Sequence, residues 1–153
     1  MKLDSSKIKF SDFDVKRGLK LPSVLTEKLA EDIGIMIGDG HIGKNIRKCR
    51  AVDYQVLCSG NAVSDKDYMR NHVKNLKLDL FGLNFSVYVV GKNKSEIRLK
   101  INSKGLVDFY TKVVGLPLNK KENISIPPLI WHNKNFIRRP RILRGLSEAK
   151  TRR

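Results

Sequence analysis

The stretch LAEDIGIMIGDGHIG, residues 29–43, places two glycines inside an apolar run with helical spacing. A glycine inside a helix costs about 1 kcal/mol relative to alanine, so this helix needs a compensating contact. Ala30, Gly34 and Gly38 recur at every fourth residue and form a stripe of small side chains on one helix face. Such a stripe favours close approach of a second helix. The alternative is a helix packed closely on its own sheet.

Asp39 ends this helix, where the helix dipole is already negative. An acid there is unfavourable unless a cation lies near. If the stripe packs against a two-fold mate, two such acids converge and repel each other. A hard divalent cation with oxygen ligands, such as Mg²⁺, would relieve the repulsion and activate water. The alternative is an exposed aspartate in an Asp-Gly turn.

The charge balance points to a polyanionic partner. Lysine and arginine number 31 against 15 acids, which gives a net charge of +16. DNA or RNA is the first expectation and an acidic membrane surface the second. The sequence contains neither an apolar run long enough to span a membrane nor an apolar signal segment at its start. Cys49 and Cys58 fit a reducing, intracellular location, cytoplasmic or organellar.

The hydrophobic pattern predicts an α+β domain. Helices are expected from Thr26 to about Asp39, over 65–81 and over 104–116, with strands over 41–50, 52–59, 83–91 and 96–103. The order αββαββα predicts an antiparallel four-stranded sheet with helices on one face. We divide the chain into an irregular basic arm (1–22), this domain (23–132) and a basic helical tail (133–153).

One face of the predicted sheet is polar and basic. Alternation places apolar side chains on the other face and leaves Asn45, Arg47, Gln55, Ser59, Arg98 and Lys100 on this one. Such a face can lie along a DNA duplex and contact bases and phosphates. The alternative is an ordinary solvated sheet face, which antiparallel sheets commonly have.

The residues LAEDIGIMIGDGHI resemble the signature helix of the LAGLIDADG homing endonucleases. The motif covers Asp32–Gly40, with Gly34, Gly38 and Asp39 among its defining positions. Three later segments are similar in the same order: SGNAVSDKDY, EIRLKINSKGLVDF and the connector LPLNKKENISIP. The resemblance extends over about residues 20–146.

The resemblance implies a site-specific endonuclease that hydrolyses phosphodiester bonds of double-stranded DNA with Mg²⁺ or another divalent cation. Two motif helices pack together, here from a homodimer through Ala30, Gly34 and Gly38. It implies Asp39 as metal ligand, assisted by the Gly38 carbonyl, and Lys120 or Lys121 as a catalytic lysine. Asn61 corresponds to a residue of the family's water network, although turn formation is the simpler account.

The same resemblance places the first strand in the DNA major groove. Alternation from Asp39 then directs His41, Asn45 and Arg47 toward the bases. Gln55 is suited to adenine, and Arg47 or Arg98 to guanine. We expect Lys44, Lys48, Lys92 and Lys94 to meet phosphates or solvent.

The C-terminal segment departs from the family pattern. Gly145 and Ala149 repeat the spacing of Gly34 and Gly38, but Lys150 stands where a second motif would carry its acid. This leaves a half-site endonuclease that cuts as a homodimer, encoded in an intron or an intein. The alternative is a non-cleaving DNA- or RNA-binding relic, or an intron-splicing helper, of the same fold.

Overall fold

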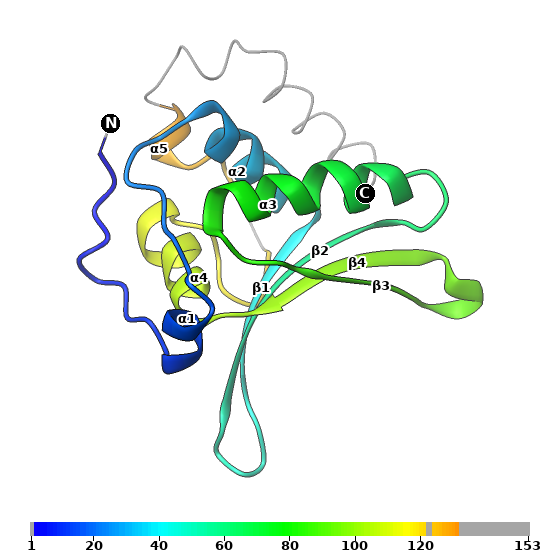
Figure 1. Ribbon diagram of the computed structural model, residues 1–153, viewed down its shortest axis with the longest axis horizontal. Coiled ribbons are helices and arrows are strands. Elements are labelled where there is room, and N and C mark those ends of the chain that lie inside the picture. Colours follow the sequence, from blue (N-terminus) through cyan, green and yellow to red (C-terminus); the bar gives the residue numbers. More distant parts are fainter. Residues whose placement is uncertain (1, 122–123, 132–153) are drawn as a thin grey trace.

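The computed structural model describes residues 2–121 and 124–131 and shows an α+β fold (Figure 1). Four strands form one antiparallel sheet in the order β1-β2-β4-β3. The strands are β1 (Gly40–Ile46), β2 (Val52–Asn61), β3 (Ser86–Val90) and β4 (Glu96–Asn102). The helices are α1 (Asp12–Lys16), α2 (Glu27–Asp39), α3 (Lys74–Phe81), α4 (Lys104–Asp108) and α5 (Pro128–Trp131). The predicted fold class and element order are confirmed.

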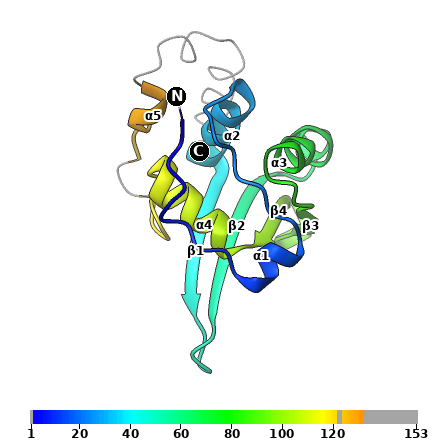
Figure 2. The same cartoon turned by 60° about the vertical axis from the view of Figure 1, so that its left-hand side comes forward.

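Helices α2, α3 and α4 pack on the same face of the sheet (Figures 1 and 2). The side chains between the layers are apolar, and Val56, Cys58 and Leu99 have no exposed surface. Residues that alternate with them point away from the helices and form what we call the open face. In the described part of the chain, no helix is long and apolar enough to cross a membrane.

Helix α2 passes into β1 without an intervening turn. The Thr26 side chain accepts a hydrogen bond from the Leu29 amide and caps the start of the helix. Asp39 is the last helical residue, and Gly40 begins the strand. A β-carbon on Gly40 would lie 2.6 Å from Met36 Cα, so glycine allows the close approach of strand and helix. The interpretation of Asp39-Gly40 as a free turn is therefore wrong.

The small-residue stripe on α2 is largely inaccessible. Ala30 has no exposed surface, Gly34 is buried, and Gly38 is partly exposed. This burial agrees with the alternative of close packing within one chain. Homodimerisation through these three residues stays a prediction. The proposed tail, with Gly145, Ala149 and Lys150, lies outside the described residues.

Several element boundaries differ from the sequence-based expectation. The arm is not wholly irregular, because Ser11 and Asp14 form a capping box that starts α1. The first strand ends at Ile46 instead of residue 50, since Arg50 adopts a left-handed conformation (φ 65°) in the hairpin turn. The second and third helices both contain a π-helical segment, Tyr68–Val73 and Phe109–Val114.

The arm is anchored to the domain through a buried carboxylate. Asp14 has no exposed surface and accepts hydrogen bonds from the Ser103 hydroxyl (2.6 Å) and the Gly105 amide (2.8 Å). Burial alone would raise the pKa of Asp14, but these hydrogen bonds and those from Ser11 outweigh burial and lower the pKa. The ionised carboxylate therefore joins α1 to the start of α4.

Three buried polar side chains connect the helices beneath the sheet. Lys77 Nζ lies 2.6 Å from Asp32 Oδ1, and it donates to the Tyr110 hydroxyl at 2.9 Å. That hydroxyl donates to Asp32 Oδ2 at 2.5 Å. Burial lowers the pKa of Lys77, but the Asp32 carboxylate outweighs burial and raises it. Burial and the same carboxylate raise the pKa of Tyr110. The network therefore holds a charged ion pair and a neutral phenol.

Replacing the lysine should destabilise the fold strongly. We expect Lys77→Met to lower the free energy of unfolding by about 3–5 kcal/mol, because Asp32 would keep a buried charge without its partner. Urea denaturation followed by circular dichroism measures this loss. The double variant Asp32→Asn/Lys77→Met removes both charges and should lose less. If the single variant is no less stable than the double variant, the ion pair does not carry this role.

Candidate functional site

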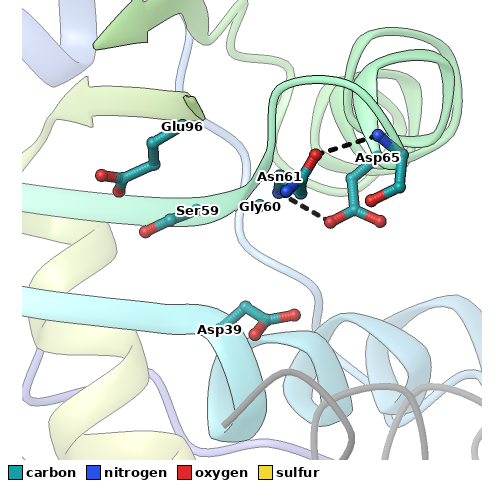
Figure 3. A pocket seen from close by; sticks show the side chains of 7 residues that line it. Asp39, Ser59, Gly60, Asn61, Asp65 and Glu96 are labelled. Atoms are coloured by element: carbon teal, nitrogen blue, oxygen red, sulfur yellow. Dashed lines mark hydrogen bonds between the residues drawn. The ribbon is translucent and has the colours of Figure 1, made fainter. Parts of the chain in front are cut away.

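Asp39 lies at the rim of a pocket of about 450 Å³. The pocket opens between the end of α2, the end of β2 and the start of β4 (Figure 3). It is lined by Asp39, Ser59, Gly60, Asn61, Ser64, Asp65 and Glu96. Three of these side chains are acidic and none is basic, so the lining is negatively charged.

The other two acids of the pocket are held by hydrogen bonds. Asp65 Oδ2 accepts from the Asn61 amide at 2.7 Å. Glu96 accepts from Arg98 Nε at 2.8 Å and from a second guanidinium nitrogen at 3.2 Å. This Arg98 pairing lowers the pKa of Glu96, so its carboxylate is ionised at neutral pH. Sequence reasoning missed both acids as pocket residues.

Strand register brings Glu96 into the pocket. Asn61 at the end of β2 pairs with Glu96 at the start of β4, and Ser59 pairs with Arg98. Residues directly opposite in an antiparallel pair share a face. The alternation of Glu96 with Arg98 and Lys100 was visible in the sequence, but the register that places it near Asp39 was not.

The connector after α4 delivers one lysine to the end of α2. Lys121 Nζ donates to the backbone carbonyls of Gly38 (3.2 Å) and Ile37 (3.3 Å). Asn119 adopts a left-handed conformation and bonds to β1 on both sides, from its amide to Ile42 O and from Lys44 N to its side chain. Lys120 is exposed, and no described contact brings its ammonium to the helix end. Of the two candidate lysines, the geometry therefore favours Lys121.

The ammonium of Lys121 offsets the negative end of α2. Carbonyl oxygens at a helix C-terminus lack intrahelical partners, and a cation there is favourable. This contact supplies the nearby cation that the position of Asp39 required. It also engages the Gly38 carbonyl, the second predicted metal ligand, with an ammonium.

The pocket offers oxygen atoms for a hard cation but no complete ligand set. Within residues 2–121 and 124–131, no three His, Cys, Asp or Glu side chains converge closely enough to hold a metal ion by themselves. Mg²⁺ commonly uses one or two carboxylates and completes its shell with water and substrate phosphates. Asp39 and the oxygen-rich lining fit that mode of binding.

Asn61 has a structural task in this geometry. Its side-chain oxygen accepts from the amides of Val63 (2.9 Å) and Ser64 (3.0 Å) and closes the turn after β2. The side chain also borders the pocket. The turn interpretation is confirmed, and a role in a water network stays a prediction.

The register of β1, β2 and β4 places most predicted DNA-contacting residues on the open face. His41 pairs with Leu57, which pairs with Lys100, and Gly43 pairs with Gln55. Ser59 pairs with Arg98 in the next row, and Asn45 pairs with Asp53. The shared face of His41, Asn45, Gln55, Ser59, Arg98 and Lys100 is as the alternation predicted.

The remaining predicted contacts lie elsewhere. Arg47 follows the end of β1 and pairs with Asp53 across the hairpin at 2.5 Å, which raises the pKa of Arg47. Lys44 alternates with the open face, and its ammonium lies 5.7 Å from the centre of the Tyr54 ring. Lys48, Lys92 and Lys94 are exposed at the two hairpin ends. These ends project from the domain in different directions (Figure 1).

The chain is similar to part of two curated proteins, both large polypeptides of the A-type ATP synthase. It is 32% identical over 108 residues to the one from Pyrococcus abyssi, a match that covers 69% of this chain. It is 29% identical over 140 residues, 90% of the chain, to the one from Pyrococcus horikoshii. The matched segments make up only 9% and 12% of those two proteins. No family model matches the sequence.

Solved structures with a similar arrangement include I-DmoI in complex with DNA and Mn, with a TM-score of 0.48 and 15% identity. That match covers 80% of this chain and 59% of I-DmoI. I-LtrWI bound to its target DNA has a TM-score of 0.41 and 20% identity, over 57% of this chain and 31% of that one. The structural neighbours of this chain are LAGLIDADG homing endonucleases. What it does at Asp39 must be inferred from its own residues.

The ion pairs on the open face predict unequal contributions to DNA binding. Arg98 is paired with Glu96, whereas Lys100 has no acidic partner among the described residues. We expect Lys100→Ala to weaken binding of a random-sequence DNA duplex more than Arg98→Ala, because the arginine charge is already compensated. Fluorescence anisotropy at several salt concentrations measures both. Equal affinities for the two variants and the parent would contradict DNA contact through this face.

Proposed function

We propose that the chain is a divalent-metal-dependent endonuclease that hydrolyses phosphodiester bonds of double-stranded DNA at a specific site. The observation that carries the proposal is the juxtaposition of Asp39 and Lys121 at one helix end, beside an acidic pocket and the polar open face. The net charge of +16 supports a nucleic-acid partner. The resemblance of Asp32–Gly40 to the LAGLIDADG signature helix supports the same reaction.

In this proposal Asp39 provides the carboxylate that binds the cation. The cation, when bound, would neutralise phosphate charge and lower the pKa of a water molecule. Asp39 is suited to this because α2 continues directly into β1, which holds the carboxylate at the border between the pocket and the open face. The ionised Glu96 adds negative potential to the same pocket.

Lys121 acts on charge that develops at the phosphate or on the position of the attacking water. Its ammonium is held by the carbonyls of Ile37 and Gly38, so it is already oriented before substrate binds. Preorganised donors at a site of developing charge stabilise a transition state without further rearrangement. The anchoring of Asn119 on β1 sets the path of the connector that carries this lysine.

A single Asp39 site cuts one strand, so cleavage of both strands requires a second copy of the chain or a second domain. We propose a homodimer. The similarity to a small part of two large ATP synthase polypeptides favours an origin as a segment carried within another protein, as inteins are. The intracellular location expected from the two cysteines agrees with this origin.

A second candidate function is DNA or RNA binding without cleavage, as a relic or a splicing helper. One observation favours it. Lys121 already compensates the end of α2, and the described residues contain no group of three metal-binding side chains. The open face would serve binding equally well in both cases.

The catalytic acid is tested by Asp39→Asn. Cleavage of a plasmid library with Mg²⁺ at low salt should be abolished, because the amide cannot replace the anionic ligand. DNA affinity should stay within about tenfold, equal to about 1.4 kcal/mol. Asp79→Asn, which removes an exposed acid of α3 paired with Lys28, is the matched control and should cleave normally. Undiminished cleavage by Asp39→Asn would contradict the assignment, and absence of cleavage by the parent would favour the second candidate.

The choice between the two lysines is tested by paired variants. We expect Lys121→Met to reduce the single-turnover cleavage rate by about 100-fold or more, in the range found when a preorganised donor is removed. Lys120→Met removes the same charge from an exposed neighbouring site and should change the rate little. The opposite order of effects would assign the catalytic role to Lys120.

A further inference from the structure

A second pocket, of about 450 Å³, lies where the α3 segment meets the start of β3. It is lined by Arg70, Lys74, Asn84, Phe85, Ser86 and Val87. The lining contains two cations and no acid, the reverse of the pocket beside Asp39. The two pockets are therefore suited to ligands of opposite charge.

The two cations of this pocket are not neutralised by neighbours. Arg70 lies in the π-helical segment and Lys74 begins α3, so they are four residues apart and share one side of the helix. Among the described residues, neither has an acidic partner, whereas Lys28 and Lys77 on adjacent elements are both paired. Two adjacent uncompensated charges repel each other, and an anion between them relieves the repulsion.

The opposite wall of the pocket supplies neutral hydrogen-bonding groups. Asn84 and Ser86 are exposed, and no hydrogen bond within the described part of the chain engages their side chains. Phe85 between them is 1% exposed and anchors the segment in the core. Guanidinium, ammonium, amide and hydroxyl donors around one hollow are the usual partners of a phosphate group.

The pocket lies at the border of the open face. Strand β3 is at one edge of the sheet, and Ser86 pairs with Lys100 on the open face. Four strands spaced about 4.8 Å apart span about 14 Å from first to last, close to the width of about 12 Å of the DNA major groove. A duplex seated on the open face would therefore bring the phosphates that flank the groove to the sheet edges.

We propose that Arg70 and Lys74, with Asn84 and Ser86, form a binding site for a backbone phosphate of the DNA duplex that lies on the open face. The site extends the DNA contact around the β3 edge onto the helical layer. This inference rests on the proposed function in needing duplex DNA as the partner, but it does not depend on cleavage.

The test is the salt dependence of binding to a random-sequence DNA duplex, measured by fluorescence anisotropy with the full chain. The variant Arg70→Gln/Lys74→Gln keeps polar, exposed side chains and removes both charges. It should bind about tenfold more weakly near 0.15 M salt, and the slope of log affinity against log salt should fall by about 1–2, as loss of one or two phosphate contacts predicts. The control Lys7→Gln/Lys16→Gln removes two exposed charges from the N-terminal segment and should leave the slope unchanged.

Each other outcome has a separate meaning. An unchanged slope in the Arg70/Lys74 variant, or an equal change in the control, overturns the site while duplex binding by the parent stands. If the parent does not bind the duplex, the proposed function fails and the inference fails with it. A thermal-shift assay with millimolar inorganic phosphate, against sodium chloride of equal ionic strength, separates the sources of the phosphate. Stabilisation lost in the variant, together with an unchanged DNA slope, assigns the pocket to a free anion and overturns DNA contact.

Discussion

The buried contact between Asp32 and Lys77 fixes the helix on which the candidate site depends. Asp32 belongs to α2, Lys77 to α3, and Tyr110 to the π-helical segment after α4, so one polar network joins all three helices of the layer. A buried charge without its partner is costly, and the network is therefore satisfied in only one arrangement of these helices. Because α2 is held in this way, the position of Asp39 at its end is determined by the core and not by the exposed loops.

The sheet distributes charge along the open face in an order that suits a metal-assisted reaction on a phosphate backbone. Carboxylates gather where α2 ends and β4 begins, around Asp39 and Glu96. Uncompensated cations gather farther along, at Lys100 and in the pocket of Arg70 and Lys74. A cation is attracted to the first region and phosphates to the second. Arg98 lies between them and is neutralised by Glu96, which limits its pull on either ligand.

Much of the fold could be predicted because its signals are local. Thr26 before an apolar helical run, and the alternation of Ile97, Leu99 and Ile101, indicate a helix and a strand in any context. Helix α1 was missed because five residues do not form a stable helix alone. Its stability depends on Asp14, whose partners Ser103 and Gly105 are about 90 residues away. The π-helical segments likewise have no recognisable pattern in the sequence.

The candidate site divides in the same way. Asp39, the small residues of α2, the strand alternation and the excess of basic residues are properties of the sequence itself, and they determined the expected fold, the acid and the class of partner. The choice of Lys121 over Lys120, the entry of Asp65 and Glu96 into the pocket, and the gathering of Arg70 and Lys74 beside Ser86 were decided by the tertiary structure. The physical reason is that periodicity specifies which side of an element a residue occupies. Strand register and helix packing specify which sides meet, and they depend on contacts between residues far apart in the chain.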